Sequence, residues 1–404
     1  MAVNTSRRLM IAIIAVQLLL AVAYAIPVLT KADRLTGSDF RIYYTGAAIV
    51  RDGRGSNLYD LDLQRSYQAE VVAQGGAGPR YALFPFINPP HAALLLVPFT
   101  YFSPNTASAV FLAFDFLIAA WLLFRFWQIS VGWSYLERTL LLTTVLGTEV
   151  FWYNFGLLTM TFFVCICIVE YYLALRAKHD TRAALWLIAA TVKPQLFLLP
   201  ALIPLALRQG RLILTAVGLG LLLGFLVSLI LGFHIWLDYF RVLREVSAHG
   251  ETYGAITTLM NNLRMILYWT APPQAVNPLV YLALFGSLVG LFWLWRSSRQ
   301  FDLRFALTLL LGLFVAPYLH YQDTLIAFLP AAITYGFARR ERRNLISVFQ
   351  VLVLAVTFVP ALLLVTGHDR PLAFVWPLPL IILLMVTIWI ALFGTPTQTD
   401  RDDN

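Results

Sequence analysis

The chain has 404 residues, of which 60% are hydrophobic and only 12% are charged. A soluble domain carries about twice that share of charged residues, so the composition argues against a soluble enzyme. The net charge of +8 does not indicate a nucleic-acid partner, because the basic excess lies in short loops between apolar runs, where it reports orientation. Cys165 and Cys167 lie in one apolar run without disulfide or metal spacing.

Apolar segments recur from end to end, which predicts an all-α polytopic membrane protein with about 12 crossings from 13 segments. The first segment follows Arg7 and Arg8; it could be a signal peptide, but no small-x-small cleavage site is convincing, so we interpret it as a retained helix. The segments are 9–29, 83–102, 106–127, 139–153, 157–175, 183–192, 195–207, 212–233, 276–295, 304–318, 321–338, 345–366 and 371–394.

Basic loops predict which end of each span faces the cytoplasm. With the N-terminus inside, residues 30–82, residues 234–275 and the turn 317–320 fall outside. Four apolar segments separate the first outer loop from the basic loop 176–182. An odd number of crossings is needed to bring that basic loop inside, so we expect one of the four segments to be partial or re-entrant. The other basic loops contain Arg208, Arg211, Arg296, Arg299, Arg304, Arg339, Arg340, Arg342 and Arg343.

Residues 30–82 form a loop too long for a plain connector. We expect short amphipathic helices over 39–50 and 60–74, with Asp60 as the N-cap of the second, lying on the membrane surface. Residues 1–394 are interpreted as one transmembrane domain, with a disordered cytoplasmic tail over 395–404.

Two further short segments, 183–192 and 195–207, flank Lys193-Pro194. Because proline breaks a helix, they predict a hairpin of two short helices with Lys193 at its outer tip. Each would be shorter than the ~30 Å core of a bilayer, so this tip is expected below the outer surface, where unwound backbone is tolerated only against protein or water.

Asp39 stands ten residues after the first span. Its carboxylate could accept a proton from a sugar hydroxyl as a general base, or it could simply cap the helix 39–50. Lys193 is the only lysine between residues 179 and 404. It could bind a phosphate as a point charge, or it could be a snorkelling lysine at a helix end.

His320 and Asp323 lie three residues apart on a predicted outer turn. They could form an acid–base or phosphate-binding pair, or they could hold a turn that ends one helix and caps the next. Arg264 in the loop 234–275 could clamp a phosphate, although polar residues on such a loop are more often only solvated. Asn88, before Pro89-Pro90, is typical of helix entry.

The chain contains no motif for binding a nucleotide. There is no Walker motif, Gly-rich dinucleotide loop, nucleophile elbow or zinc-ligand spacing, and no Asp-x-Asp lies in a basic cytosolic loop. This absence favours a sugar donor that is already activated and carried on a lipid.

Several strings resemble glycosyltransferase family 87, whose members use polyprenyl-phosphate sugars and have the type C glycosyltransferase fold. They are Asp39 to Ala47, Asn57-Leu58-Tyr59-Asp60, Phe86 to Pro90 with Pro98, and Lys193-Pro194-Gln195. The resemblance covers most of residues 9–340, and the first loop is its most specific part. The chain departs from the family's usual pattern at Asn88-Pro89-Pro90, where Tyr-Pro-Pro is common, and at Gly156-Leu157, where Gly-Gln is common.

The resemblance implies an inverting transferase in the cell membrane with its active site on the periplasmic or extracellular side. Asp39 would be the general base, and His320 would orient it or stabilise the phosphate. Lys193 and Arg264 would neutralise the departing phosphate, with no metal or cofactor required. The polar residues expected to contact substrate are Tyr43, Tyr44, Asn88, Gln195, Asn261, Gln322 and Asp323.

The implied partners are a polyprenyl-phosphate-linked sugar, a glycolipid or glycan acceptor and membrane lipids. The family includes mycobacterial mannosyl- and arabinofuranosyltransferases, so mannose is expected first, and arabinofuranose or another pentose or hexose stays open. A lipid-linked saccharide flippase is a second hypothesis, although transporters tend to show internal repeats and midplane charges. A membrane scaffold without activity is a third.

Overall fold

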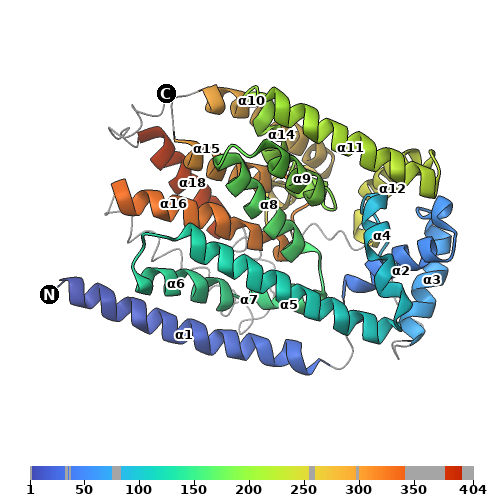
Figure 1. Ribbon diagram of the computed structural model, residues 1–404, viewed down its shortest axis with the longest axis horizontal. Helices are drawn as coiled ribbons and strands as arrows, with labels where there is room; N and C mark the ends of the chain where they lie inside the picture. Colours follow the sequence, from blue (N-terminus) through green and yellow to red (C-terminus); the bar gives the residue numbers. More distant parts are fainter. Residues whose placement is uncertain are drawn as a thin grey trace.

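The computed structural model describes residues 2–31, 35, 38–74, 83–253, 260–296, 300–341 and 378–393. Within these ranges the chain is a bundle of helices (Figure 1), and β-structure is confined to one isolated bridge between Met260 and His320. The predicted segment 345–366, the tail 395–404, and parts of the loops 30–82 and 234–275 lie outside the described residues. One hydrophobic core cluster runs from Val28 to Leu384.

Four described helices are long and apolar enough to cross a membrane. They are α1 (Ala2–Thr30), α5 (Pro104–Ile129), α11 (Gly210–Leu231) and α14 (Pro273–Arg296). Their outer faces expose large apolar side chains that water would not tolerate in such a density, as expected for lipid contact. These side chains include Leu18, Leu19, Val22, Ile26, Leu214, Leu221, Phe225, Leu229, Leu282, Phe285, Val289 and Trp293. About 12 crossings stays a prediction.

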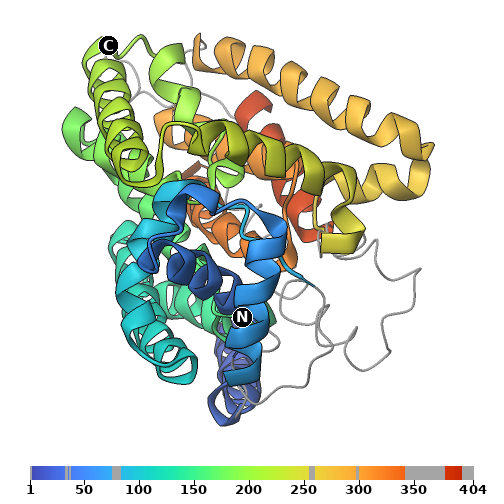
Figure 2. The same ribbon diagram turned by 90° about the vertical axis from the view of Figure 1, so that its right-hand side faces the viewer.

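The connecting helices gather at one end of the bundle, which we call the loop-helix end. It contains α2 (Phe40–Arg51), α3 (Leu61–Gln74), α4 (Pro90–Leu96) and α12 (Ile235–Ala248), on the right in Figure 1 and facing the viewer in Figure 2. The first two confirm the helices predicted over 39–50 and 60–74. Asp60 caps α3 as expected, since its Oδ1 accepts from the backbone of Asp62 (2.9 Å) and Leu63 (3.1 Å).

Residues 83–102 do not form a spanning helix. Residues 83–89 have no regular structure, and they are followed by the seven residues of α4 and a 3₁₀ helix, η2 (Val97–Tyr101). Pro89 and Pro90 start α4, so the helix-entry interpretation of Asn88-Pro89-Pro90 is confirmed. This segment is short enough to be the partial one that the loop charges predict. Among the four apolar segments concerned, however, only α5 is a candidate span, so which of them crosses stays a prediction.

The apolar run predicted over 139–153 is divided between two helices, α6 (Tyr135–Leu146) and α7 (Glu149–Leu157), and α8 (Thr161–Arg176) follows. The break between α7 and α8 is fixed by Leu158, whose φ of 53° is left-handed. That conformation ends helices but is usually taken by glycine or asparagine, so a fully buried leucine here holds strained backbone.

The predicted hairpin around Lys193 is right in its first arm and wrong in its second. α9 (Asp180–Ala190) ends before Lys193-Pro194 as expected. The second arm, however, consists of η3 (Pro194–Leu196), η4 (Pro200–Leu202) and the four-residue α10 (Ile203–Ala206). Three prolines, Pro194, Pro200 and Pro204, each remove a backbone donor within eleven residues, which leaves only short turns.

The last described helices are α13 (Leu263–Thr270), α15 (Phe301–Val315), α16 (Phe328–Glu341) and α18 (Leu378–Phe393). The segment expected as one helix over 321–338 begins instead as a 3₁₀ helix, η7 (Tyr321–Ala327). Runs of 3₁₀ structure longer than three or four residues are uncommon and often mark functional positions. This one carries Asp323.

Candidate active site

Asp39 immediately precedes α2 and is held by its backbone, not by its side chain. Its N–H donates to the carbonyl of Leu157 at the end of α7 (2.8 Å), which satisfies one of the carbonyls that a helix end leaves open. Its carboxylate forms no capping bond to α2 and is partly exposed. Asp39 thus occupies the N-cap position of α2, where its backbone carbonyl accepts from Ile42 (2.9 Å), but the structure contradicts a capping role for its side chain.

A buried ion pair lies beside Asp39. Lys193 Nζ is 2.8 Å from Asp323 Oδ1 and donates to Thr161 Oγ1 (3.2 Å), while that hydroxyl donates to the same Asp323 oxygen (2.8 Å). Lys193 is 7% exposed and Asp323 is 2% exposed. A snorkelling lysine would extend its ammonium into water. Lys193 does not, and the interpretation of Lys193 as a snorkelling residue is therefore wrong. An ammonium has three donors, and two of those of Lys193 are used here.

The charges of this pair act on Asp39. Burial raises the pKa of Asp39 from 3.8 to about 6; the positive charge of Lys193 lowers it, Asp323 raises it, and Arg41 lowers it. A half-buried carboxyl with a pKa near 6 can accept a proton at neutral pH more readily than an ordinary aspartate. The proton acceptor and the cation expected from the sequence thus lie within electrostatic reach of each other.

His320 and Tyr43 complete this cluster. Burial lowers the pKa of His320 below its usual range, Asp323 raises it, and Lys193 lowers it, so the imidazole is neutral at pH 7. His320 stands at the N-cap position of η7, but its side chain forms no capping hydrogen bond to that helix. Tyr43, on the first turn of α2, is 3% exposed, and burial raises the pKa of its hydroxyl, on which Lys193, Asp39 and Asp323 also act.

Arg264 approaches the turn 316–320 through α13. Its Nε donates to the carbonyl of Pro317 (2.7 Å), and its guanidinium lies 5.2 Å from the ring of Tyr318. Its Nη2 is buried and has no hydrogen-bond partner in the part of the chain that the structure describes. The neighbouring Asn261 donates from its backbone to Leu319 (2.9 Å), which ties this turn to the loop before α13.

Four other residues predicted to contact substrate are Tyr44, Asn88, Gln322 and Gln195, and the first three form hydrogen bonds within the protein. Tyr44 is not part of the cluster, since its hydroxyl donates to Phe102 (2.9 Å). Asn88 donates to the carbonyl of Val192 (3.0 Å) and so supports the Lys193 turn. The backbone carbonyl of Gln322 accepts from Asn154 (2.9 Å), and Gln195 on η3 is partly exposed.

Two residues were missed by sequence reasoning. Thr161 joins the ion pair at the start of α8, and Asn154, which is fully buried, links α7 to η7 and accepts from Thr159 (2.6 Å). Their signal was a run of polar residues, Asn154, Thr159 and Thr161, inside an apolar stretch. Polar side chains at such depth need partners, but the sequence does not name which ones.

No three His, Cys, Asp or Glu side chains in the described ranges are grouped so as to hold a metal ion. The family model of glycosyltransferase family 87 matches residues 86–319, more than half of the chain. No curated protein and no solved structure matches the chain significantly. The match contains Lys193 and Arg264, and it ends one residue before His320. The chain therefore belongs to glycosyltransferase family 87 and is a membrane glycosyltransferase.

Proposed function

We propose that the protein transfers a sugar from a polyprenyl-phosphate donor to a hydroxyl of a glycolipid or glycan acceptor, at the non-cytoplasmic face of the cell membrane. The observation that carries this proposal is the carboxylate of Asp39, which is partly exposed, caps no helix and lies in the field of the Lys193–Asp323 pair. The resemblance to mannosyltransferases makes mannose the first sugar to test, with arabinofuranose and other sugars as alternatives.

In this mechanism Asp39 takes the proton of the acceptor hydroxyl while the oxygen attacks the anomeric carbon. The bond between that carbon and the phosphate oxygen breaks, and polyprenyl phosphate leaves with its bonding electrons. Attack opposite to the leaving group inverts the anomeric configuration. General-base assistance of this kind contributes roughly 10²–10⁴-fold to a rate.

The leaving phosphate gains negative charge, and two cations are available to it. Within the described chain Lys193 uses two of its three donors, for Thr161 and Asp323, which leaves one for the phosphate. Arg264 has a buried Nη2 with no hydrogen-bond partner in the described chain, although burying a polar group unpaired costs free energy. A phosphate oxygen would satisfy it. Neutral His320 would serve as a hydrogen-bonding group between donor and base.

The test uses purified full-length protein, radiolabelled polyprenyl-phosphate-mannose and glycolipid acceptors. Asp39→Asn is compared with Asp62→Asn, an exposed aspartate on α3. Transfer by wild type and Asp62→Asn, with a loss of at least 10²-fold in Asp39→Asn, supports the proposal. Lipid movement across the bilayer without transfer would point to a flippase instead. Transfer by Asp39→Asn at the wild-type rate would exclude Asp39 as the base.

A further inference from the structure

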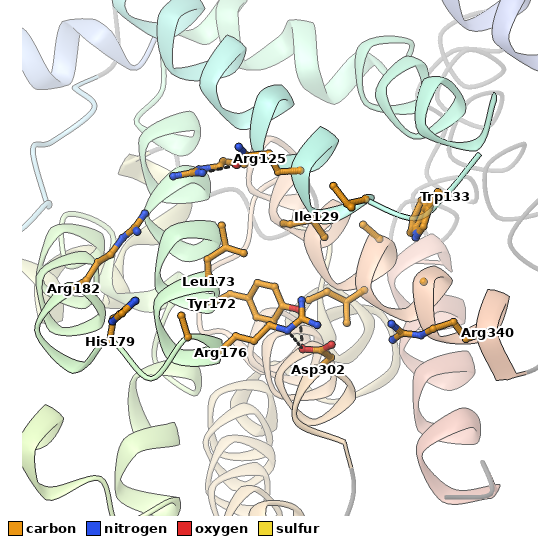
Figure 3. A pocket seen from close by; sticks show the side chains of 16 residues that line it. Arg125, Ile129, Trp133, Tyr172, Leu173, Arg176, His179, Arg182, Asp302 and Arg340 are labelled. Atoms are coloured by element: carbon orange, nitrogen blue, oxygen red, sulfur yellow. Dashed lines mark hydrogen bonds and ion pairs between the residues drawn. The ribbon is translucent and has the colours of Figure 1, made fainter. Parts of the chain in front are cut away.

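A cavity of about 460 Å³ lies at the end of the bundle opposite the loop-helix end. It is enclosed by the ends of α5, α8 and α16 and the beginnings of α9 and α15, with the turn after α5. Its volume falls in the ~300–1,000 Å³ range of ligand pockets. Four arginines line it, Arg125, Arg176, Arg182 and Arg340, and Figure 3 shows how their side chains are arranged around it.

Positive charge exceeds negative charge around this cavity. Glu170, fully buried, binds both Arg125 and Arg182. Asp302 accepts from the hydroxyl of Tyr172 (2.9 Å) and pairs with Nε of Arg176 (3.3 Å). Among the described residues that line the cavity or pair with its arginines, two carboxylates stand against four guanidinium groups, which leaves an excess of two positive charges.

Two of the arginines have donors to spare. Arg176 uses only its Nε for Asp302, and within the described chain its two terminal amino groups have no hydrogen-bond partner. Arg340, at the end of α16, forms no hydrogen bond or ion pair with any described residue, yet it lines the cavity. A planar guanidinium with free terminal donors binds a phosphate through two parallel hydrogen bonds.

The position of the cavity along the candidate span α5 indicates that lipid headgroups can reach it. The candidate span α5 runs from Pro104 to Ile129, and its last turn lines the cavity. Aromatic rings surround this turn: those of Trp127 and Tyr135 are 6.3 Å apart, and Trp133 packs on Tyr335 at 4.6 Å. Tryptophan and tyrosine concentrate where a span leaves the hydrocarbon, so these rings predict that the cavity opens at the level of the headgroups.

We propose that this cavity is a binding site for a phosphate group, supplied by the headgroup of an anionic phospholipid. Basic pockets between membrane helices are suited to such headgroups. The excess charge selects an anionic lipid over a zwitterionic one, and the free donors of Arg176 and Arg340 hold its phosphate. The site is separate from Asp39 and Lys193, and its occupancy does not depend on the sugar that the enzyme transfers.

The test is native mass spectrometry of the full-length protein in detergent, titrated with phosphatidylglycerol or with phosphatidylcholine of the same acyl chains. The variant Arg176→Gln/Arg340→Gln leaves Arg125 and Arg182 in place, because their loss would strand the buried Glu170. Its control, Arg241→Gln/Arg244→Gln, removes two exposed arginines of α12, one of which pairs with Asp238 as Arg176 pairs with Asp302. Melting temperatures verify that each variant is folded, and the single variant Arg340→Gln is tested as well.

Wild type and control are expected to prefer phosphatidylglycerol, and the pocket variant is expected to bind it about tenfold more weakly or worse. Competition with inorganic phosphate shows whether the bound phosphate group comes from a lipid headgroup or from solution. Binding that resists competition supports a lipid phosphate, and competition that depends on the same two arginines supports a soluble phosphate in the same site. Equal lipid binding by the folded pocket variant and the control, with no effect of inorganic phosphate, would overturn the proposal.

Discussion

At the scale of single residues, Asp39 differs from an ordinary loop aspartate in its surroundings. Burial is the main cause of its pKa of about 6, and the carboxylate must be ionised to accept a proton. The sequence could identify this residue as a candidate base, because an acid stands just after the first span. It could not separate base from helix cap, since both interpretations require an aspartate before the same helix.

The pH dependence of transfer tests this residue directly. Because the pKa is raised to about 6, the ionised fraction and the rate should fall about tenfold per pH unit below that value. An unshifted aspartate would keep the rate constant down to about pH 4. The measurement is kcat/KM between pH 4 and 8, and the residual activity of Asp39→Asn should lack this limb. A wild-type profile flat to pH 4 would contradict a raised pKa at the base.

The Lys193–Asp323 pair leads to a second prediction. Replacing Lys193 with Met leaves a buried carboxylate without its cation, which should cost roughly 3–5 kcal/mol of stability. The double variant Lys193→Met/Asp323→Asn removes both charges and should recover most of the loss. If Lys193 also binds the donor phosphate, this double variant melts near the wild-type temperature but stays inactive. Recovery of transfer together with stability would mean that the pair is only structural.

Sequence reasoning recognised both members of this pair but not that they meet. They lie 130 residues apart, and the connection depends on how α8, η3 and η7 pack. Thr161, which joins them, is recognisable in the sequence only as part of a polar run, which does not name its partners. Roles for Lys193 and Asp323 could therefore be predicted from residue type and position, whereas their contact is a property of the tertiary fold.

At the scale of elements, the contact between α1 and α6 depends on small and polar side chains. Gln17, fully buried in α1, donates to Thr144 (3.0 Å) and accepts from Thr143 (2.7 Å). Gly147, at the end of α6, lies so close that an added Cβ would be 2.8 Å from the backbone oxygen of Gln17. Close approach at small residues with interhelical hydrogen bonds is how helices associate in a membrane.

We therefore predict that Gly147→Ala destabilises the protein by about 1–3 kcal/mol, because backbone must shift to admit the methyl group. The matched control is Gly286→Ala in α14, where an added Cβ would meet nothing within 4 Å. Alanine should be neutral or slightly stabilising there, given its higher helix propensity. Thermal unfolding in detergent measures both. Equal melting temperatures for the two variants would show that α1 and α6 are less tightly packed than described.

The helices themselves could be predicted where the pattern was strong. Hydrophobicity and capping residues predicted α2, α3 and α5 to within one or two residues. The largest errors fall where proline overrides an apolar run, as in the segments 83–102 and 195–207. Apolar composition reports burial, but proline decides whether a buried segment can be helical, and three prolines within 194–204 favour turns over a second hairpin arm.

At the scale of the whole molecule, a segment 83–102 that does not cross the membrane would make the loop charges agree with the rule that basic loops face the cytoplasm. α1 ends near the loop-helix end, α5 leaves it, α6 and α7 return to bond Asp39, and α8 leaves again toward Arg176. If α1 crosses from the cytoplasm, as the basic-loop rule predicts, this path would put the basic loop after α8 on the cytoplasmic side. Asp39 directly precedes α2 at the loop-helix end, whereas the arginine-lined cavity is lined by the ends of α5, α8 and α16, at the other end of the bundle (Figure 1).

This arrangement predicts opposite labelling of two introduced cysteines. Ser66 on α3 and Thr181 on α9 are exposed at the two ends, while the native Cys165 and Cys167 are buried, so the wild type should not react. A membrane-impermeant maleimide should label Ser66→Cys in right-side-out vesicles and Thr181→Cys in inside-out vesicles, because basic loops stay in the cytoplasm. The reverse pattern would place the Asp39 site on the cytoplasmic face, where its donor would have to be presented from the inner leaflet. Labelling of both cysteines from one side would mean that the two ends of the bundle do not lie across the membrane from each other.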